Sequence, residues 1–293
     1  MITGVLAVDK PQGWTSHDVV AKLRGIYREK RIGHSGTLDP MATGVLVVFL
    51  GRATRAVERC ENDEKTYLAG LLLGRITNTQ DVTGQVLEER QVAVSKDLLL
   101  ETLKRFQGPQ NQIPPMYSAV KIGGRKLYEL ARKGQDVERK PRSITISSLE
   151  LVDFDGREAM LRVRCSKGTY VRTLCHDIGM ALGCGGCLSS LRREQAGRFT
   201  LEDCVSLEEI QAAREEDRHL LLLRPVDSLF FELPALELDG LRTVRCKNGA
   251  EVPADAPAGE YRVYGPDGEF LLLGSVQDGV LRTIKSFFEV KEG

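Results

Sequence analysis

The pattern of apolar and polar positions predicts strands and helices in alternation near the start of the chain. Apolar runs at residues 2–8, 45–50 and 65–73 are short and are bounded by Gly, Pro or charged residues, which is typical of buried strands. After Ser16, apolar positions recur with helical spacing, so we expect a helix that Ser16 caps. Its apolar face comprises Val19, Val20, Leu23, Ile26 and Tyr27.

The middle of the chain continues this mixed pattern. We expect helices over residues 95–106, 126–133 and 170–182, a loop over the Pro- and Gly-rich residues 107–124, and paired strands over 144–154 and 159–165. Ser206, followed three residues later by Glu209, has the capping-box pattern that starts a helix. Strands and helices interleave without a βαβ rhythm, which favours an α+β fold over a doubly wound one.

The pattern changes after Pro225 to short strands, expected over residues 260–264, 269–276 and 280–284. We therefore place a domain boundary near residues 225–235 and predict two domains, 1–230 and 231–293. The second, with about 60 residues, is at the lower end of what folds alone.

Composition is that of a globular protein, with 42% hydrophobic and 28% charged residues in a chain of 293. No apolar run approaches the roughly 20 residues that cross a bilayer, and the first residues lack the basic start of a signal peptide. Seven cysteines, an odd number spread over a long chain, do not suggest a disulfide framework. We expect a cytoplasmic protein without a membrane partner.

The net charge is zero, but the charges are unevenly distributed. Residues 121–142 contain eight Lys or Arg and three acids, whereas residues 199–240 contain three Arg and eleven acids. Such asymmetry suggests that one face meets a polyanion. Two solvated helix surfaces would explain it equally well.

The densest chemical signal is the stretch 33–44, Gly-His-Ser-Gly-Thr-Leu-Asp-Pro-Met-Ala-Thr-Gly. Its glycines, proline and small hydroxyl residues predict a tight loop before the strand 45–50, and such loops often carry catalytic groups. Pro40 keeps Asp39 out of the helical region, so the Asp39 carboxylate is a candidate nucleophile or base. Considered alone, an Asp-Pro turn is the commoner explanation.

The stretch 33–44 resembles the signature motif of the TruB-type family, the bacterial tRNA pseudouridine-55 synthases. Five further stretches between residues 4 and 230 resemble that family's motifs in the same order. They are Lys10-Pro-x-Gly-x-x-Ser16, Lys65-x-Tyr67, Ile113-Pro-Pro-Met-Tyr-Ser-Ala-Val-Lys121 with Tyr128-Glu-Leu-Ala-Arg-Lys-Gly134, Cys165-Ser-Lys-Gly-Thr-Tyr-Val-Arg-Thr-Leu174, and Leu191-Arg-Arg193. Five concordant motifs beside the first outweigh the turn explanation for Asp39.

The resemblance implies roles for individual residues. Asp39 would be the catalytic nucleophile, Arg172 would pair with it, and Tyr67 would stack on the flipped uracil. The remaining pocket residues would be Tyr170, which lines the pocket, Leu191, which packs on the base, and His34, which contacts the displaced part of the T loop. Without the resemblance, Tyr67, Tyr170, Arg172 and Leu191 would each more often be structural residues.

The chemistry of these roles is physically consistent. Isomerisation breaks the N1–C1′ bond, turns the base and joins C5 to C1′, so the base must first leave its stack at a cost of a few kcal/mol. An aromatic partner returns about 1–3 kcal/mol. An aspartate near its ordinary pKa of about 3.9 is ionised at neutral pH, and a neighbouring arginine keeps it so. No group or electron is imported, so we expect neither a cofactor nor a metal.

The resemblance also implies the fold and the RNA contacts. It implies a mixed, mainly antiparallel central sheet with peripheral helices, a thumb-like insertion at residues 113–142 that clamps the T arm, and a small PUA-like β-barrel that contacts the acceptor stem. The barrel is the weaker match and depends mainly on residues 245–249. The candidate phosphate contacts in the insertion are Arg132, Lys133, Arg139 and Lys140. For the oligomeric state, we expect a monomer.

Cys184 and Cys187 form a CxxC pair, which invites a zinc or redox interpretation. A closed zinc site needs four ligands, and the chain has no second CxxC or HxxxH. Cys175 and His176 lie nearby, so a Cys/His site stays open, although small-residue packing is favoured.

Two other functions compete with isomerisation of the T-loop uridine at position 55. A non-catalytic tRNA-binding protein or RNA chaperone would use the same groove only for grip, but it has no need for a buried ion pair that costs desolvation energy. A synthase directed at rRNA or working in a ribonucleoprotein shares the motifs, but the short tail and the absence of basic extensions disfavour it.

Overall fold

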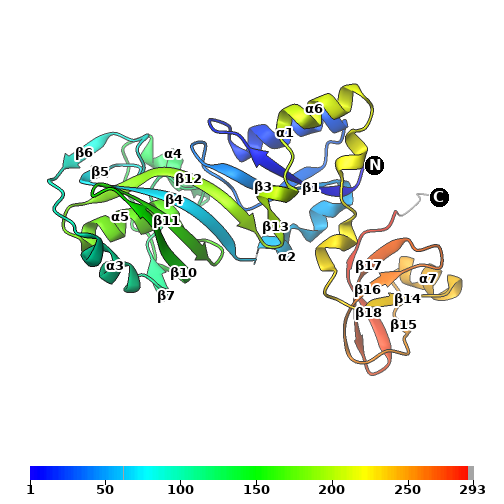
Figure 1. The fold of residues 1–293 in the computed structure, drawn as a ribbon. Helices are drawn as coiled ribbons and strands as arrows, with labels where there is room; N and C mark the ends of the chain where they lie inside the picture. Colours follow the sequence, from blue (N-terminus) through cyan, green and yellow to red (C-terminus); the bar gives the residue numbers. More distant parts are fainter. Residues whose placement is uncertain (62, 290–293) are drawn as a thin grey trace.

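The computed structural model describes residues 1–61 and 63–289. A large curved sheet forms one part of the molecule, and a smaller sheet made by the C-terminal residues lies beside one end of it (Figure 1). No helix in these two described ranges is long and apolar enough to cross a membrane.

The large sheet has nine strands in the order β1-β3-β12-β4-β11-β10-β7, with β2 paired to β3 and β13 to β12. Its strands are β1 (Gly4–Lys10), β2 (Ile32–Ser35), β3 (Thr43–Leu50), β4 (Lys65–Leu73), β7 (Gly108–Gln112), β10 (Arg142–Phe154), β11 (Glu158–Cys165), β12 (Gly186–Ala196) and β13 (Phe199–Thr200). Every pairing is antiparallel except β3 with β12. The α+β class with a mixed, mainly antiparallel sheet is confirmed.

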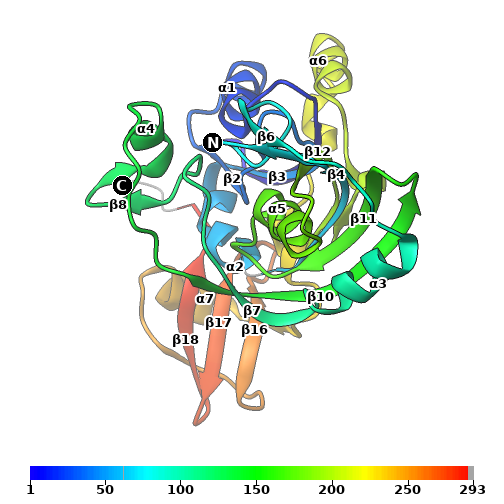
Figure 2. The same cartoon turned by 90° about the vertical axis from the view of Figure 1, so that its left-hand side faces the viewer.

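Helices cover both halves of this sheet. The helices of this part of the chain are α1 (Ser16–Tyr27), α2 (Val57–Glu61), α3 (Lys96–Lys104), α4 (Leu127–Ala131), α5 (Val171–Ala181) and α6 (Leu207–Glu215). Of these, α4 does not cover the sheet and belongs to the arm described below. The apolar faces of α1 and α6 pack on β1 and β3. The other half of the sheet curls around α5, as Figure 2 shows, and buries it in the largest hydrophobic cluster.

The cap of α1 differs from the expectation. Thr15, not Ser16, is the N-cap residue, and it forms a capping box with Asp18. Ser16 is fully buried, and its hydroxyl is used elsewhere, on the backbone of Leu38. The start of the helix was predicted within one residue, but the capping hydroxyl belongs to Thr15 and not to Ser16.

Residues 107–124 are not a continuous loop, contrary to the expectation. β7 is an edge strand that pairs only with β10, and Pro109 is tolerated there because an edge strand leaves one side unpaired. Beyond β7 the chain forms a small arm from β8 (Lys121–Ile122), β9 (Arg125–Lys126) and α4. The arm protrudes from the body in Figure 2, and it leaves and rejoins the sheet at the paired residues Gln112 and Arg142.

Part of the expected loop 33–44 is also regular. Gly33 and His34 belong to β2, and Thr43 already begins β3, so only the middle of the stretch is irregular. A second, two-stranded sheet of β5 (Arg75–Thr77) and β6 (Val86–Glu89) lies beyond the end of β4.

The C-terminal residues form a curled five-stranded sheet in the order β14-β16-β17-β18-β15. Its elements are β14 (Ala235–Glu237), α7 (Gly240–Lys247), β15 (Val252–Pro253), β16 (Gly259–Tyr264), β17 (Phe270–Gln277) and β18 (Val280–Ser286). Its order is open rather than circular, so the described residues form a half-barrel instead of the expected closed barrel. The sequence pattern did not predict α7.

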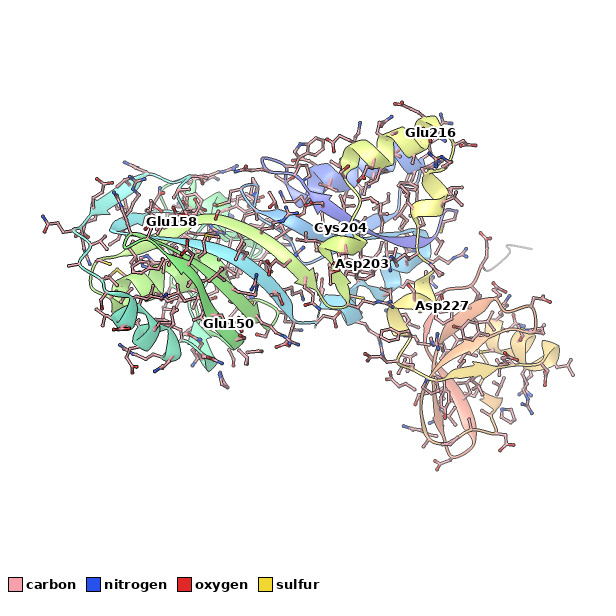
Figure 3. The ribbon with its side chains drawn as sticks, viewed as in Figure 1. Glu150, Glu158, Asp203, Cys204, Glu216 and Asp227 are labelled. Atoms are coloured by element: carbon pink, nitrogen blue, oxygen red, sulfur yellow. The ribbon has the colours of Figure 1, made fainter. Side chains whose placement is uncertain are left out.

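The junction between the two parts is built from polar and aromatic contacts. Asp227, labelled in Figure 3 where the two parts meet, accepts a hydrogen bond from the Tyr264 hydroxyl at 2.8 Å. Arg59 of α2 forms a bidentate pair with Glu260 at 2.7 and 3.0 Å. Phe230 and Phe287 share one hydrophobic cluster with residues of β1 and β3. The C-terminal sheet is therefore docked on the larger part.

Candidate active site

Asp39 lies in the turn between β2 and β3, and the backbone before it is fixed by the start of α1. The Ser16 hydroxyl accepts a hydrogen bond from the Leu38 amide at 2.9 Å and donates one to the Leu38 carbonyl at 3.2 Å. Both groups are buried, so a single side chain satisfies the two backbone groups of the residue next to Asp39.

The backbone after Asp39 is fixed by the segment between β1 and α1. The Pro40 carbonyl accepts hydrogen bonds from the Gly13 amide at 2.8 Å and from Lys10 Nζ at 3.4 Å. Lys10 is fully buried, and this burial lowers its pKa to about 8, while Asp39 acts in the opposite direction. The motif at residues 10–16 thus clamps the Asp39 turn from both sides.

Arg172, at the start of α5, faces the Asp39 side chain. Its Nε lies 2.8 Å from Asp39 Oδ2, and its Nη2 donates a hydrogen bond to Asp39 Oδ1 at 3.3 Å. The Arg172 side chain is only 5% exposed, whereas that of Asp39 is 37% exposed. The carboxylate is therefore open to a ligand on one side and held by a buried guanidinium on the other.

Asp81 is a second carboxylate next to Arg172, and sequence analysis missed it. Its Oδ2 lies 3.6 Å from Arg172 Nη1. Its Oδ1 accepts hydrogen bonds from the Thr79 hydroxyl at 2.8 Å and from the Thr83 amide and hydroxyl at 2.9 and 2.6 Å. The motif search offered no signal for Asp81, because the Asp-x-Thr-Gly stretch at 81–84 is an ordinary turn pattern.

The pKa of Asp39 is raised above its usual value, in contrast to the expectation of an ordinary carboxyl. Burial is the main cause, and the neighbouring Asp81 carboxylate adds to it. Arg172 lowers the pKa by favouring the charged form, and Lys10 contributes in the same sense. Arg172 is the strongest influence that keeps Asp39 ionised.

Tyr67 and Leu191 lie in the same hydrophobic cluster as Leu38 and Ala42, the residues that flank the Asp39 turn. β4 supplies Tyr67 and its neighbour β12 supplies Leu191. Burial raises the pKa of Tyr67, so its hydroxyl stays protonated. The structure thus pairs Asp39 with Arg172 and places Tyr67 and Leu191 in the hydrophobic cluster beside the Asp39 turn.

Arg193 is a buried cation below the Asp39 turn. It is 1% exposed, and it donates hydrogen bonds to the carbonyls of Val45 at 2.6 Å and Gly36 at 3.1 Å. The backbone of Arg193 also passes so close to Gly44 that a Cβ there would lie 2.2 Å from the Arg193 carbonyl oxygen. Gly44 therefore permits the parallel contact between β3 and β12.

His34 lies on β2, beside this cation. Its pKa is lowered by burial and by the positive charge of Arg193, so the imidazole is neutral near neutral pH. Its Nδ1 is buried and has no hydrogen-bond partner within the described residues. The structure therefore places an uncharged imidazole next to Arg193.

Tyr170 precedes α5 as its N-cap residue. Its amide donates a hydrogen bond to Gln112 Oε1 at 2.8 Å, and its carbonyl accepts one from Gln112 Nε2 at 3.1 Å. Gln112, which is 4% exposed, is a second residue that sequence analysis missed.

The cations of the 113–142 arm lie apart from Asp39 and differ from one another. Lys133 and Lys140 are exposed, and so is Arg132, whose guanidinium lies over the Tyr128 ring at 5.4 Å. Arg139 is only 24% exposed, and its Nη1 donates a hydrogen bond to the Pro114 carbonyl at 3.2 Å. Three of the four candidates present free charge at the surface.

The CxxC cysteines are buried at the start of β12. Burial raises the pKa of Cys187 to about 11, which leaves the thiol protonated. Across residues 1–61 and 63–289, no group of three or more His, Cys, Asp or Glu is placed to hold a metal ion. These residues fit small-residue packing, since a Cβ on the adjacent Gly186 would touch Leu71 and the backbone of α5.

Comparison with known proteins is consistent with this geometry. Residues 24–171 match the family model for the TruB family pseudouridylate synthase N-terminal domain, and residues 172–230 match that for the tRNA pseudouridylate synthase B C-terminal domain. The chain is 44% identical to tRNA pseudouridine synthase B of Ralstonia pickettii over 96% of this chain and 93% of that protein. It is 39% identical to the Clostridium kluyveri protein of the same name, over 97% and 99%.

Two solved structures share the fold. One is an H/ACA ribonucleoprotein bound to a substrate RNA that contains 2′-deoxyuridine, with 25% identity, a TM-score of 0.73, and coverage of 98% of this chain and 85% of that one. The other is a Cbf5-Nop10-Gar1 complex, with 28% identity, the same TM-score, and coverage of 97% and 85%. From the matched family models and the near full-length relatives, we conclude that the chain belongs to the TruB family of pseudouridylate synthases.

Proposed function

We propose that this protein is a tRNA pseudouridine synthase that isomerises the uridine at position 55 of the T loop. The observation that carries the proposal is the Asp39–Arg172 pair, a reachable carboxylate held by a buried guanidinium. The near full-length relatives named tRNA pseudouridine synthase B, at up to 44% identity, support tRNA as the substrate. The ribonucleoprotein structures are more distant, at 25% and 28% identity.

Each residue of the site then has a role. Asp39 acts as the nucleophile on the flipped nucleotide, and Arg172 keeps it charged and oriented. Tyr67 stacks on the base, and the remaining contacts come from Leu191 on the base, Tyr170 at the pocket wall, and His34 at the displaced part of the T loop. The chemistry needs no cofactor, because all atoms of the product come from the substrate.

The domain assignment is part of the proposal. Residues 1–230 form the catalytic domain, with 113–142 as the thumb-like arm that grips the T arm through Arg132, Lys133 and Lys140. Residues 231–293 form a PUA-like domain that meets the acceptor stem, and its open half-barrel is compatible with a binding surface. We propose that the protein works in the cytoplasm as a monomer.

The experiment that tests this function uses unmodified tRNA transcript and measures pseudouridine at the T loop. We expect complete conversion at position 55, and none in a transcript that has cytidine there. An isolated T-arm hairpin should be converted with lower affinity if the acceptor stem contributes. Tight binding of tRNA without any pseudouridine would instead support the chaperone alternative.

A further inference from the structure

The root of the arm contacts the residue that precedes α5, the helix that carries Arg172. Residues 113–141 leave the sheet after Gln112 and return at Arg142, and these two residues are partners across β7 and β10. The arm is therefore joined to the sheet through this pair. The side chain of Gln112 takes no part in this backbone pairing and binds the backbone of Tyr170 instead.

Both hydrogen-bonding groups of the Gln112 amide are used on one residue. Oε1 accepts from the Tyr170 amide at 2.8 Å, and Nε2 donates to the Tyr170 carbonyl at 3.1 Å. Because these two bonds fix the peptide planes on both sides of Tyr170, they set the direction in which α5 starts. Arg172 follows two residues later, in the first turn of that helix.

A second contact joins the arm to the same arginine. Arg172 Nη2 donates a hydrogen bond to the Tyr117 carbonyl at 3.0 Å, in addition to its contacts with Asp39 and Thr79. The arm therefore reaches Arg172 once directly, through Tyr117, and once through Gln112 and Tyr170.

The segment that precedes α5, residues 166–170, is attached to the sheet separately at its first residue. Thr145 of β10 accepts a hydrogen bond from the Ser166 amide at 2.9 Å and donates its own amide to the Ser166 hydroxyl at 2.9 Å. Loss of Gln112 would thus release the end of this segment near Arg172 while its start stays attached to the sheet.

We propose that Gln112 is a positioning residue that couples the root of the RNA-gripping arm to the Tyr170–Arg172 turn. This inference depends on the proposed function, because it assigns Gln112 a part in the same reaction. Gln112, through Tyr170, and the Tyr117 carbonyl hold Arg172 against Asp39. Gln112 itself touches neither the substrate nor Asp39.

The test compares Gln112→Leu with Gln110→Leu under single-turnover conditions, with the enzyme in excess over tRNA and at a saturating concentration. Gln110 is a matched control because it lies on the same strand and its amide binds the Phe106 carbonyl at 2.6 Å instead of Tyr170. For Gln112→Leu we expect a rate constant lower by about 10- to 100-fold, an unchanged reaction amplitude, and nearly unchanged tRNA affinity. Gln112→Glu keeps an acceptor for the Tyr170 amide and should recover part of the rate.

The fraction of enzyme molecules that bind tRNA, titrated separately, distinguishes positioning from misfolding, because the rate constant at saturating enzyme does not depend on that fraction. A wild-type rate constant in Gln112→Leu, or an equal loss in Gln110→Leu, would overturn the proposal.

Hydrogen exchange distinguishes failure of the positioning role of Gln112 from failure of the proposed function. In Gln112→Leu, amides of residues 168–174 should exchange faster than in the wild type, and in Gln110→Leu they should not. If the wild type makes no pseudouridine, the proposed function fails, while exchange still tests the link between Gln112 and α5. Unchanged exchange at Tyr170 would contradict the link itself.

Discussion

At the scale of single residues, the site depends on how Asp39 is held and charged. The turn is clamped by Ser16, Gly13 and Lys10, and the carboxylate is faced by Arg172. Two opposing influences act on its ionisation, since burial raises the pKa of Asp39 and Arg172 lowers it. The balance between them has a measurable consequence.

We predict that Arg172→Gln shifts the acid limb of the pH–rate profile to higher pH. Asp39 must be ionised to act as a nucleophile, so activity is lost as the pH falls through its pKa. Without Arg172, burial is opposed only by Lys10, so the pKa of Asp39 rises further and the limb should move to higher pH. Single-turnover rates measured across pH test this, and Arg162→Gln, at an exposed residue of β11, is the control. A lower rate at every pH with an unmoved limb would contradict the assigned role.

We also predict that Ser16→Ala destabilises the protein and slows the reaction. The change leaves the buried Leu38 amide without its partner, which costs about 1–3 kcal/mol of unfolding free energy. Chemical denaturation and single-turnover rates provide the two readouts. Ser148→Ala, whose hydroxyl donates to Glu150 on the surface at 2.9 Å, should change neither. Equal stability of the Ser16 variant and the wild type would show that the clamp is unimportant.

How well the sequence predicted these residues depends on where their partners lie. Asp39, Tyr67 and Arg172 were predicted because they belong to recognisable motifs, and the structure shows the contact between Asp39 and Arg172. Asp81 and Gln112 were missed because each acts through a residue about 60 or more positions away, for example 91 between Asp81 and Arg172. No local pattern carries such a contact. The raised pKa of Asp39 was missed for the same reason, since it depends on burial.

At the scale of elements, the spacing of apolar positions predicted most helices and strands well, whereas the Pro and Gly content of a segment was misleading. β4 was predicted at its observed bounds, and α1, α3, α5, α6 and the β10–β11 hairpin were found within a few residues. β7 was missed because Pro and Gly indicate loops, although an edge strand tolerates them. β12 was not predicted, since its polar residues are satisfied by contacts from distant segments, such as Arg193 with Val45.

The arm at 113–142 gives a prediction at this scale. Simultaneous change of the exposed Arg132, Lys133 and Lys140 to Ala should weaken tRNA binding and reduce the log–log salt slope by about 2–3, because each phosphate contact contributes roughly 0.7–0.9. Binding measured over a series of salt concentrations tests this. A control variant with Lys96, Lys104 and Arg105 changed to Ala removes three exposed cations around α3. An unchanged salt slope in the arm variant would show that the arm does not contact phosphates.

At the scale of the whole molecule, acidic and basic residues are concentrated in different segments of the chain. Three acids of the negative segment are labelled in Figure 3: Glu216 at the end of α6, Asp227 at the junction and Asp203 just after β13. Figure 2 shows α6 on the side of the molecule away from the arm with α4 and β8. Of the C-terminal strands, β16, β17 and β18 were predicted closely from the pattern of short strands, whereas β14 and β15 were not. The docking of the sheet was not predicted either, because shared clusters are long-range. Phe287 of the C-terminal part and Phe49 of β3 belong to one such cluster.

The shared cluster predicts that both parts unfold together. Phe287→Ala should lower the unfolding free energy by about 3–5 kcal/mol while a single transition is kept. Phe231→Ala, at an exposed ring, should cost under about 1 kcal/mol. Calorimetry of the full chain tests this. Two separate transitions, of which only one moves with Phe287, would mean that the parts are independent.

The central claim is that the Asp39 carboxylate does the chemistry, and Asp39→Asn tests it most directly because it removes the charge while the shape is kept. Pseudouridine formation and tRNA affinity are measured on the same preparation with unmodified transcript. We predict that the variant binds tRNA about as well as the wild type and forms no pseudouridine. Pseudouridine formed at the wild-type rate by Asp39→Asn would contradict the account.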